Sequence, residues 1–148
     1  ERLTNVQNNG GIESVNITYY RDNLVGTHSH TFDGNTLGIT NSYDGFDMVN
    51  RVTYNFGDKT TYDNVTYDIH KDHRVMSTST SDGCVAAYNY DELSRVTSKV
   101  TSLRGKTFVK ENVEYLTYDD NALDLVKEHT YQFDNKDPVI TTYDYYNS

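Results

Sequence analysis

The chain has 148 residues, a length that fits one folded domain, and a formal net charge of −9. This charge disfavours nucleic acid as a partner, and no basic stretch offsets it. The longest apolar run is far too short to span a membrane, so no membrane insertion is predicted. Only 35% of the residues are apolar, but 14 Tyr and 5 Phe supply large rings that suit a half-buried sheet. The composition therefore predicts a folded chain.

Alternation of apolar and polar residues marks the segments that we expect to be strands. Val15, Ile17 and Tyr19 alternate with polar residues, and the same period of two is typical of half-buried β-strands. Later segments with this period are residues 52–56, 65–69, 84–90 and 139–145. Turn signals lie between such segments, at Asn9-Gly10-Gly11, Asp33-Gly34-Asn35, Phe56-Gly57-Asp58, Asp82-Gly83 and Arg104-Gly105-Lys106. The pattern predicts an all-β protein, a twisted antiparallel sheet of repeated hairpins with about ten or more strands.

Two segments fit more than one structure. Residues 93–103 carry apolar side chains at spacings that also fit a helix face, but their Thr and Ser residues favour a strand. Residues 122–129, preceded by Asp120 and Asn121 as possible caps, fit either a strand or one to two helical turns. No linker divides the chain, so we expect a single domain over residues 1–148. Its pattern begins and ends abruptly, which suggests an excerpt of a longer protein.

One motif recurs along the chain. Its clearest copy is Tyr90-Asp91-Glu92-Leu93-Ser94-Arg95-Val96, preceded by Tyr88-Asn89. Looser copies are Tyr43-Asp44 with Arg51-Val52, Tyr67-Asp68 with Arg74-Val75, Tyr118-Asp119 with Leu125-Val126, Tyr143-Asp144, and a degenerate first copy over residues 19–25. A motif that returns about every 25 residues predicts a repeat architecture, in which each unit depends on its neighbours for burial.

Each residue type of the motif suits a structural task. The tyrosine ring supplies apolar area to the sheet, and the aspartate carboxylate can accept hydrogen bonds from backbone N–H groups in the turn. The arginine can return a bidentate bond to a carboxylate. We expect the ion pairs Asp91–Arg95, Asp68–Arg74 and Asp44–Arg51.

The segment Tyr88-Asn89-Tyr90-Asp91-Glu92-Leu93-Ser94-Arg95-Val96 resembles the repeat unit of the YD-repeat family, also called RHS repeats. Ser94 stands where the family usually has glycine. The resemblance implies a segment of a YD-repeat β-shell, which is a non-catalytic scaffold or container found in bacterial toxins and in teneurins. It also implies a secreted or cell-surface location, with neighbouring repeats or an encapsulated effector as partners. The residues assigned to this structural signature are Tyr43, Asp44, Arg51, Tyr67, Asp68, Arg74, Tyr88, Tyr90, Asp91, Arg95, Tyr118, Asp119, Tyr143 and Asp144.

No catalytic, cofactor or metal site is predicted. The pairs His28/His30 and His70/His73 lack the spacing of a zinc site, and the lone Cys84 fits a small packed side chain better than a nucleophile. No residue is singled out as a catalytic acid or base. The alternative to a scaffold is a carbohydrate-binding or adhesion module, in which exposed tyrosines stack on glycans.

Overall fold

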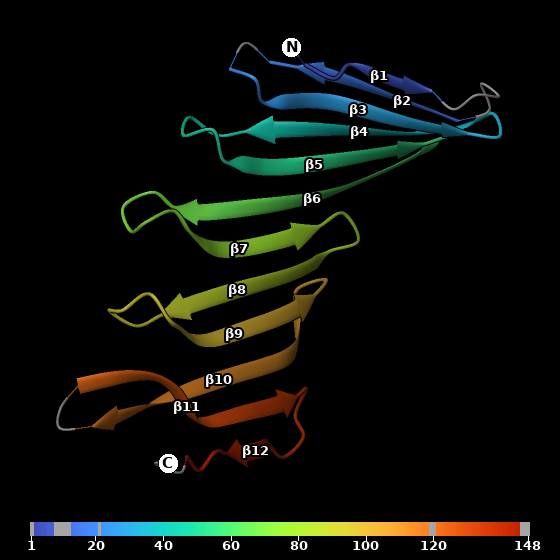
Figure 1. Cartoon of the computed structure of the whole chain (residues 1–148). Coiled ribbons are helices and arrows are strands. Elements are labelled where there is room, and N and C mark those ends of the chain that lie inside the picture. Colours follow the sequence, from blue (N-terminus) through green and yellow to red (C-terminus); the bar gives the residue numbers. More distant parts are fainter. Residues whose placement is uncertain (1, 8–12, 21, 119–120, 146–148) are drawn as a thin grey trace. The chain divides into compact units, whose positions relative to one another are not determined.

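The protein is an all-β chain whose strands pair in sequence order. The computed structural model describes residues 2–7, 13–20, 22–118 and 121–145, and this part of the chain contains no helix (Figure 1). The hydrogen-bonded strand order runs from β1 to β12 without a crossover, as an open antiparallel sheet. The strands are β1 (Asn5–Gln7), β2 (Glu13–Tyr19), β3 (Val25–Phe32), β4 (Asn35–Tyr43), β5 (Val49–Phe56), β6 (Lys59–Asp68), β7 (Arg74–Thr80), β8 (Cys84–Tyr90), β9 (Val96–Leu103), β10 (Lys106–Tyr118), β11 (Asn121–Phe133) and β12 (Val139–Thr142). The predicted antiparallel hairpin sheet is thus confirmed.

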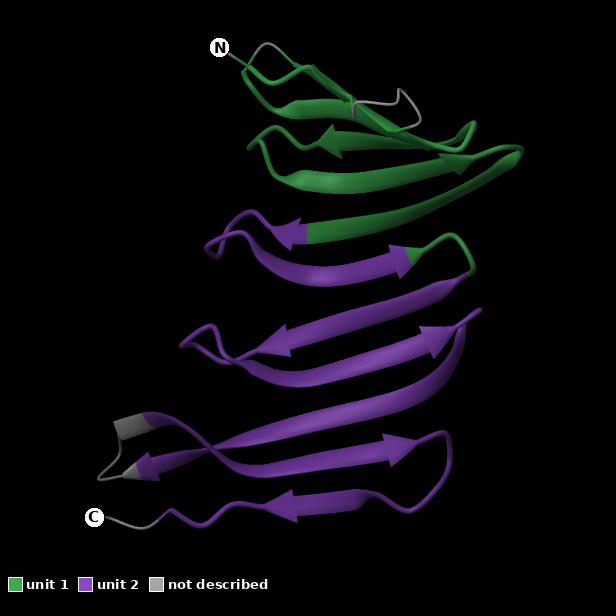
Figure 2. Ribbon diagram, turned by 45° about the vertical axis from the view of Figure 1, so that its right-hand side comes forward, with its two compact units in different colours: residues 1–66, 80–82 green, residues 67–79, 83–148 purple. Residues whose placement is uncertain are grey.

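The chain divides into two compact units (Figure 2). The first comprises residues 1–66 and 80–82, and holds β1 to β5 with most of β6. The second comprises residues 67–79 and 83–148, and holds most of β7 with β8 to β12. Within each unit every strand pairs with the strands that precede and follow it along the chain.

Tight turns with left-handed backbone join the two strands of several hairpins. Between β3 and β4, Asp33 and Gly34 have φ values of 46° and 74°, and between β9 and β10, Arg104 and Gly105 have 50° and 80°. Two successive positive φ values belong to the hairpin turn whose twist matches that of the flanking strands. These are turns that the sequence predicts, because glycine adopts such φ values without steric cost.

Both segments that the sequence left open are strands in the described residues. Residues 96–103 form β9, while Leu93 lies in the preceding turn. Residues 121–133 form β11, which pairs with β10 on one side and β12 on the other. Residues 119–120 lie outside the described part. β11 pairs with β10 along most of its length and with β12 over residues 128–131, so this tertiary context overrides any local preference of the segment for a helical turn.

The two faces of the sheet in the first unit differ in character. One face carries apolar and aromatic side chains, with Ile17 opposite His28, His28 opposite Ile39, and Ile39 opposite Tyr54. The other face carries a row of hydroxyl side chains across four strands, in the order Thr18, Thr27, Thr40, Thr53. The Oγ1 atoms of Thr18 and Thr27 lie 2.6 Å apart in a hydrogen bond. The period of two therefore separates an apolar face from a polar one.

Neither face is deeply buried. Among the described residues Ala86 is the only buried apolar side chain, with 8% of its surface exposed. Large side chains at strand ends remain open to solvent, including Phe32 at 62% and Phe56 at 53%. The fold therefore depends on its strand ladder and on contacts near the turns, which are where the repeated residues lie.

Candidate functional site

The best-matching copy of the motif builds a turn around the carboxylate of Asp91. Its Oδ1 accepts hydrogen bonds from the backbone N–H groups of Leu93 (3.0 Å) and Arg95 (2.9 Å). The Asp91 N–H donates to the Arg95 carbonyl at 3.0 Å, which closes the turn between β8 and β9. Ser94 has a φ of 64°, the left-handed region that favours glycine. The aspartate therefore organises the turn, as its place in the motif predicts.

Asp44 organises the turn between β4 and β5 in the same way. Its Oδ1 accepts from the N–H groups of Phe46 (2.9 Å) and Met48 (3.1 Å), and its own N–H donates to the Met48 carbonyl at 2.9 Å. Asp47 has a φ of 62°, equivalent to Ser94. Because Tyr43 pairs with Val49 just as Tyr90 pairs with Val96, this turn has the same length as the Asp91 turn.

Two further turns differ from the Asp44 and Asp91 turns in their first residue or in their length. Tyr20 takes the place of the aspartate between β2 and β3, where its N–H donates to the Leu24 carbonyl at 2.8 Å and Asn23 has a φ of 66°. Asp68 begins a longer turn and accepts from the His70 N–H at 3.0 Å. His70 and His73 are thus residues of this turn, and His73 has a φ of 53°.

Arg95 bonds the Asp91 carboxylate and covers a tyrosine ring. Its Nε and Nη2 atoms both lie 2.7 Å from Asp91 Oδ2, and its guanidinium carbon lies 4.1 Å from the centre of the Tyr115 ring. Arg95 also donates to the Leu123 carbonyl. Burial opposes ionisation of Asp91, but the hydrogen bonds and charge of Arg95 outweigh it, so the pKa of Asp91 is lowered.

The arginines of the looser copies differ in their partners. Arg74 lies 3.8 Å from Asp68 Oδ2 and 4.7 Å from the centre of the Tyr90 ring. Burial is the main cause that raises the pKa of Tyr90, and the charge of Arg74 opposes it. Arg51 lies farther along β5, opposite Ser42 and 4.0 Å from the centre of the Tyr62 ring. The structure thus brings Asp91 to Arg95 and Asp68 to Arg74, and places Arg51 on an aromatic ring.

A second recurring contact was not visible in the sequence, and we call it the tyrosine clasp. In each clasp a tyrosine of an even-numbered strand, or of the residues that follow it, donates its hydroxyl to a carbonyl in or just before the preceding odd-numbered strand. Clasps in the described residues include Tyr19 to Leu3 (2.8 Å), Tyr43 to Val25 (2.9 Å), Tyr90 to Val75 (2.6 Å), Tyr115 to Val96 (3.0 Å) and Tyr145 to Val126 (2.9 Å). Since the chain joins the two strands of each hairpin at the other end, the clasp holds the open end of the hairpin.

An arginine precedes the accepting residue in three of these clasps. Arg2 precedes Leu3, as Arg74 precedes Val75 and Arg95 precedes Val96. The residue after each arginine accepts the hydroxyl of a tyrosine, and the guanidinium lies over the ring of that same tyrosine. Arg2, for example, lies 5.5 Å from the centre of the Tyr19 ring. A cation over an aromatic face is attracted by the ring. The dipeptide Arg-Val or Arg-Leu therefore forms a socket for one tyrosine of the same hairpin.

The remaining residues of the predicted signature lie at or near strand ends or outside the described part of the chain. Tyr67 is the penultimate residue of β6 and is half-buried, and Tyr88 lies half-buried opposite Lys99. Tyr143 and Asp144 are exposed and stand two and one residues before the clasp tyrosine Tyr145. The side chain of Tyr118 and the whole of Asp119 lie outside the described residues. At that hairpin the clasp is made by Tyr115.

A charged cluster lies on three neighbouring strands of the second unit, β9, β10 and β11. Lys99 Nζ is 3.1 Å from Glu111 Oε1, and His129 Nε2 is 3.8 Å from Glu111 Oε2. The His129 ring lies 4.1 Å from the ring of Tyr131. The hydrogen bond from Lys99 to Glu111 is the main cause that raises the pKa of Lys99. Only the register brings these residues together, so no local sequence signal could have revealed the cluster.

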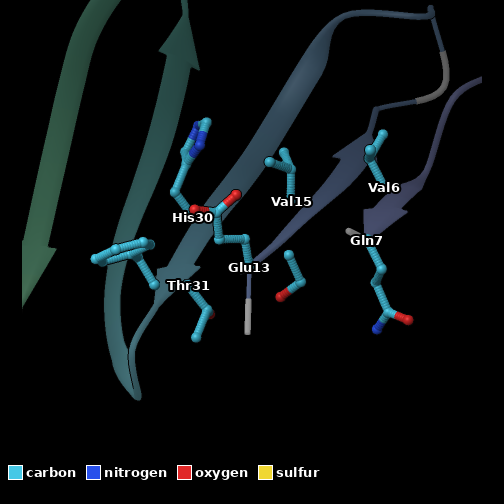
Figure 3. A pocket seen from close by; sticks show the side chains of 8 residues that line it. Val6, Gln7, Glu13, Val15, His30 and Thr31 are labelled. Carbon is cyan, nitrogen blue, oxygen red and sulfur yellow. The ribbon is translucent and has the colours of Figure 1, made fainter. Parts of the chain in front are cut away.

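Surface hollows in the described part of the chain include ones of about 300, 570 and 260 Å³. One of about 300 Å³ lies in the first unit, where Glu13, Val15 and His30 stand side by side on β2 and β3 (Figure 3). The rings of His28 and His30 are 5.4 Å apart. Among the described residues no three His, Cys, Asp or Glu side chains are grouped to hold a metal ion.

No family model and no curated protein matches the chain. A search of the described residues finds no helix long and apolar enough to cross a membrane. A functional assignment rests on what the repeated residues do. Their chemistry consists of turn capping, ring stacking and carbonyl bonding, all directed at the chain itself.

Proposed function

We propose that this chain is a segment of a YD-repeat scaffold, a non-catalytic structural or encapsulating sheet of a secreted or cell-surface, toxin-type protein. The supporting observation is that tyrosine, aspartate and arginine of the best-matching unit are all engaged in holding the sheet together. Asp91 caps the turn, Arg95 bonds Asp91 and covers Tyr115, and Tyr90 forms a clasp. In such a protein the chemistry lies in other parts, and this chain positions or encloses them.

The same observation weighs against glycan binding by the tyrosines. Tyr43, Tyr90 and Tyr115 are half-buried, and each hydroxyl already donates to a backbone carbonyl. A tyrosine that stacks on a sugar needs a free ring face. In Tyr90 and Tyr115 an arginine occupies one face. The residues that carry the motif therefore favour the scaffold over the carbohydrate-binding alternative.

The test uses electron cryo-microscopy of the natural full-length protein together with a glycan array. We expect further hairpins with tyrosine clasps on both sides of residues 2–145, arranged around an internal space whose contents resist added protease. We also expect no glycan to bind in a manner that depends on Tyr88 or Tyr143. A compact stand-alone domain, or glycan binding lost in Tyr88→Ala, would overturn the proposal.

A further inference from the structure

The tyrosine clasp of Tyr43 has a leucine where three of the other clasps have an arginine. Val25 accepts the Tyr43 hydroxyl, and the residue before Val25 is Leu24. In the best-matching copy this position is Arg95, whose guanidinium covers the Tyr115 ring. None of the contacts between an arginine and a ring that the described residues form involves Tyr43. This clasp therefore keeps the tyrosine of the repeat and replaces the arginine with an aliphatic side chain.

A second tyrosine stands where the Asp44 and Asp91 turns have their aspartate. Tyr20 begins the turn between β2 and β3, and its ring meets the Tyr43 ring edge to face, with ring centres 5.9 Å apart and ring planes at 89°. The Tyr20 hydroxyl donates to the Asn41 carbonyl at 3.2 Å, which orients the ring. Tyr20 nevertheless keeps 47% of its surface exposed. The two perpendicular rings thus form a corner that is accessible to solvent.

This corner belongs to the hollow of about 570 Å³ in the first unit. The residues that line the hollow are Tyr20, Asp22, Leu24, Ser42 and Tyr43. Asp22 is exposed and supplies a carboxylate, and Ser42 supplies a hydroxyl. Aromatic walls combined with a few polar groups are typical of ligand sites. The carboxylate at the hollow and the net charge of −9 favour a cation as the ligand.

We propose that this hollow binds the guanidinium group of an arginine side chain from a partner protein. Arg2, Arg74 and Arg95 each lie over the ring of a clasp tyrosine, so guanidinium is the cation that these rings already accept within the chain. At Tyr43 the arginine position is Leu24, and the guanidinium would come from outside, with Asp22 as its counter-ion. The inference rests on the first unit alone, and it stands whether or not the proposed scaffold function is correct.

Titration of the isotope-labelled chain with N-acetylarginine amide, followed by nuclear magnetic resonance, tests the proposal. We expect saturable shifts of backbone amide signals, confined to the residues that line the hollow and their neighbours. N-acetylcitrulline amide has nearly the same shape without the charge, and it should shift these signals little. The corresponding lysine amide should bind more weakly than the arginine amide, because an ammonium group is more strongly hydrated and does not stack as a plane.

Substitutions locate the binding. Asp22→Asn should weaken binding of the arginine amide by about two- to fivefold, as expected from the loss of one exposed ion pair. Asp33→Asn is the matched control, because Asp33 is an exposed aspartate in the turn between β3 and β4, and it should leave the affinity unchanged.

A second pair of variants tests the role of the leucine position. Leu24→Arg should place a guanidinium of the chain's own over the Tyr43 ring and lower the affinity for the arginine amide. Leu24→Met keeps an uncharged side chain of similar size and should not lower it. The proposal would be overturned by the absence of saturable binding to the unsubstituted chain, by equal binding of the citrulline or lysine amide, or by a folded Asp22→Asn variant with unchanged affinity.

Discussion

Asn23, Asp47 and Ser94 hold the same position in three turns, with φ values of 66°, 62° and 64°. A side chain in this backbone region costs about 1–2 kcal/mol, because the Cβ crowds the following carbonyl. Asn and Asp reduce this cost through their short polar side chains, and glycine avoids it. The three residues therefore mark the point of the repeat at which the turn tolerates glycine best.

Asp47→Gly should stabilise the protein. Removing the Cβ relieves the left-handed strain, while the added freedom of the unfolded chain offsets part of the gain, so the free energy of unfolding should rise by about 0.5–1 kcal/mol. Urea unfolding followed by circular dichroism measures the change. Asp47→Ala is the control, since it removes the carboxylate but keeps the Cβ. Equal stabilisation by both substitutions would contradict the role of φ.

Asp91 makes stability depend on pH at the acid end. Its folded pKa is lowered, so the ionised carboxylate stabilises the fold above its unfolded pKa of about 3.9. That contribution is lost as pH falls through the lower folded pKa. Asp91→Asn should cost about 1–2 kcal/mol at pH 7 and flatten the decline of stability below about pH 4. Urea midpoints from pH 3 to 7 check this, with the exposed neighbour substitution Glu92→Gln as the control that should change the profile little.

Among elements, the hairpin is the unit that the tyrosine clasp completes. Tyr115→Phe should lower the free energy of unfolding by about 0.5–1.5 kcal/mol, because the Val96 carbonyl loses a donor while the ring under Arg95 remains. The control is Tyr62→Phe. The Tyr62 ring also lies under an arginine, Arg51, but Tyr62 is not among the clasps found in the described residues. Thermal or urea unfolding measures both. Equal losses in the two variants would show that the clasp hydrogen bond contributes nothing specific.

The strands could be predicted from the sequence where a local pattern determines them. Val52, Tyr54 and Phe56 alternate with polar residues and lie in β5, and the glycine turn after Asp33 joins β3 to β4. The clasps could not be predicted in this way. Tyr115, which the motif does not include, donates to the Val96 carbonyl from β10, a strand whose register shifts against both of its neighbours. Such shifts arise from pairing between strands, which a single strand's pattern does not encode.

At the scale of the whole molecule, little apolar surface leaves solvent on folding. The accessible area is 10934 Å², compared with about 7,700 Å² expected for a compact monomer of 17.0 kDa. We therefore expect a heat-capacity change of unfolding below about 12 cal/mol/K per residue, the lower end for globular domains. Differential scanning calorimetry of the chain measures it. A value typical of globular domains would contradict the shallow burial.

The order of the strands has a consequence for how the chain is made. Within each unit a strand pairs only with its neighbours along the sequence, and each clasp joins residues 15 to 19 positions apart. Contacts that are close in sequence form quickly, because little chain has to be ordered before each one closes. A hairpin can thus be completed once its second strand has left the ribosome, without waiting for any distant segment. The protein is suited to folding progressively from its N-terminus during translation.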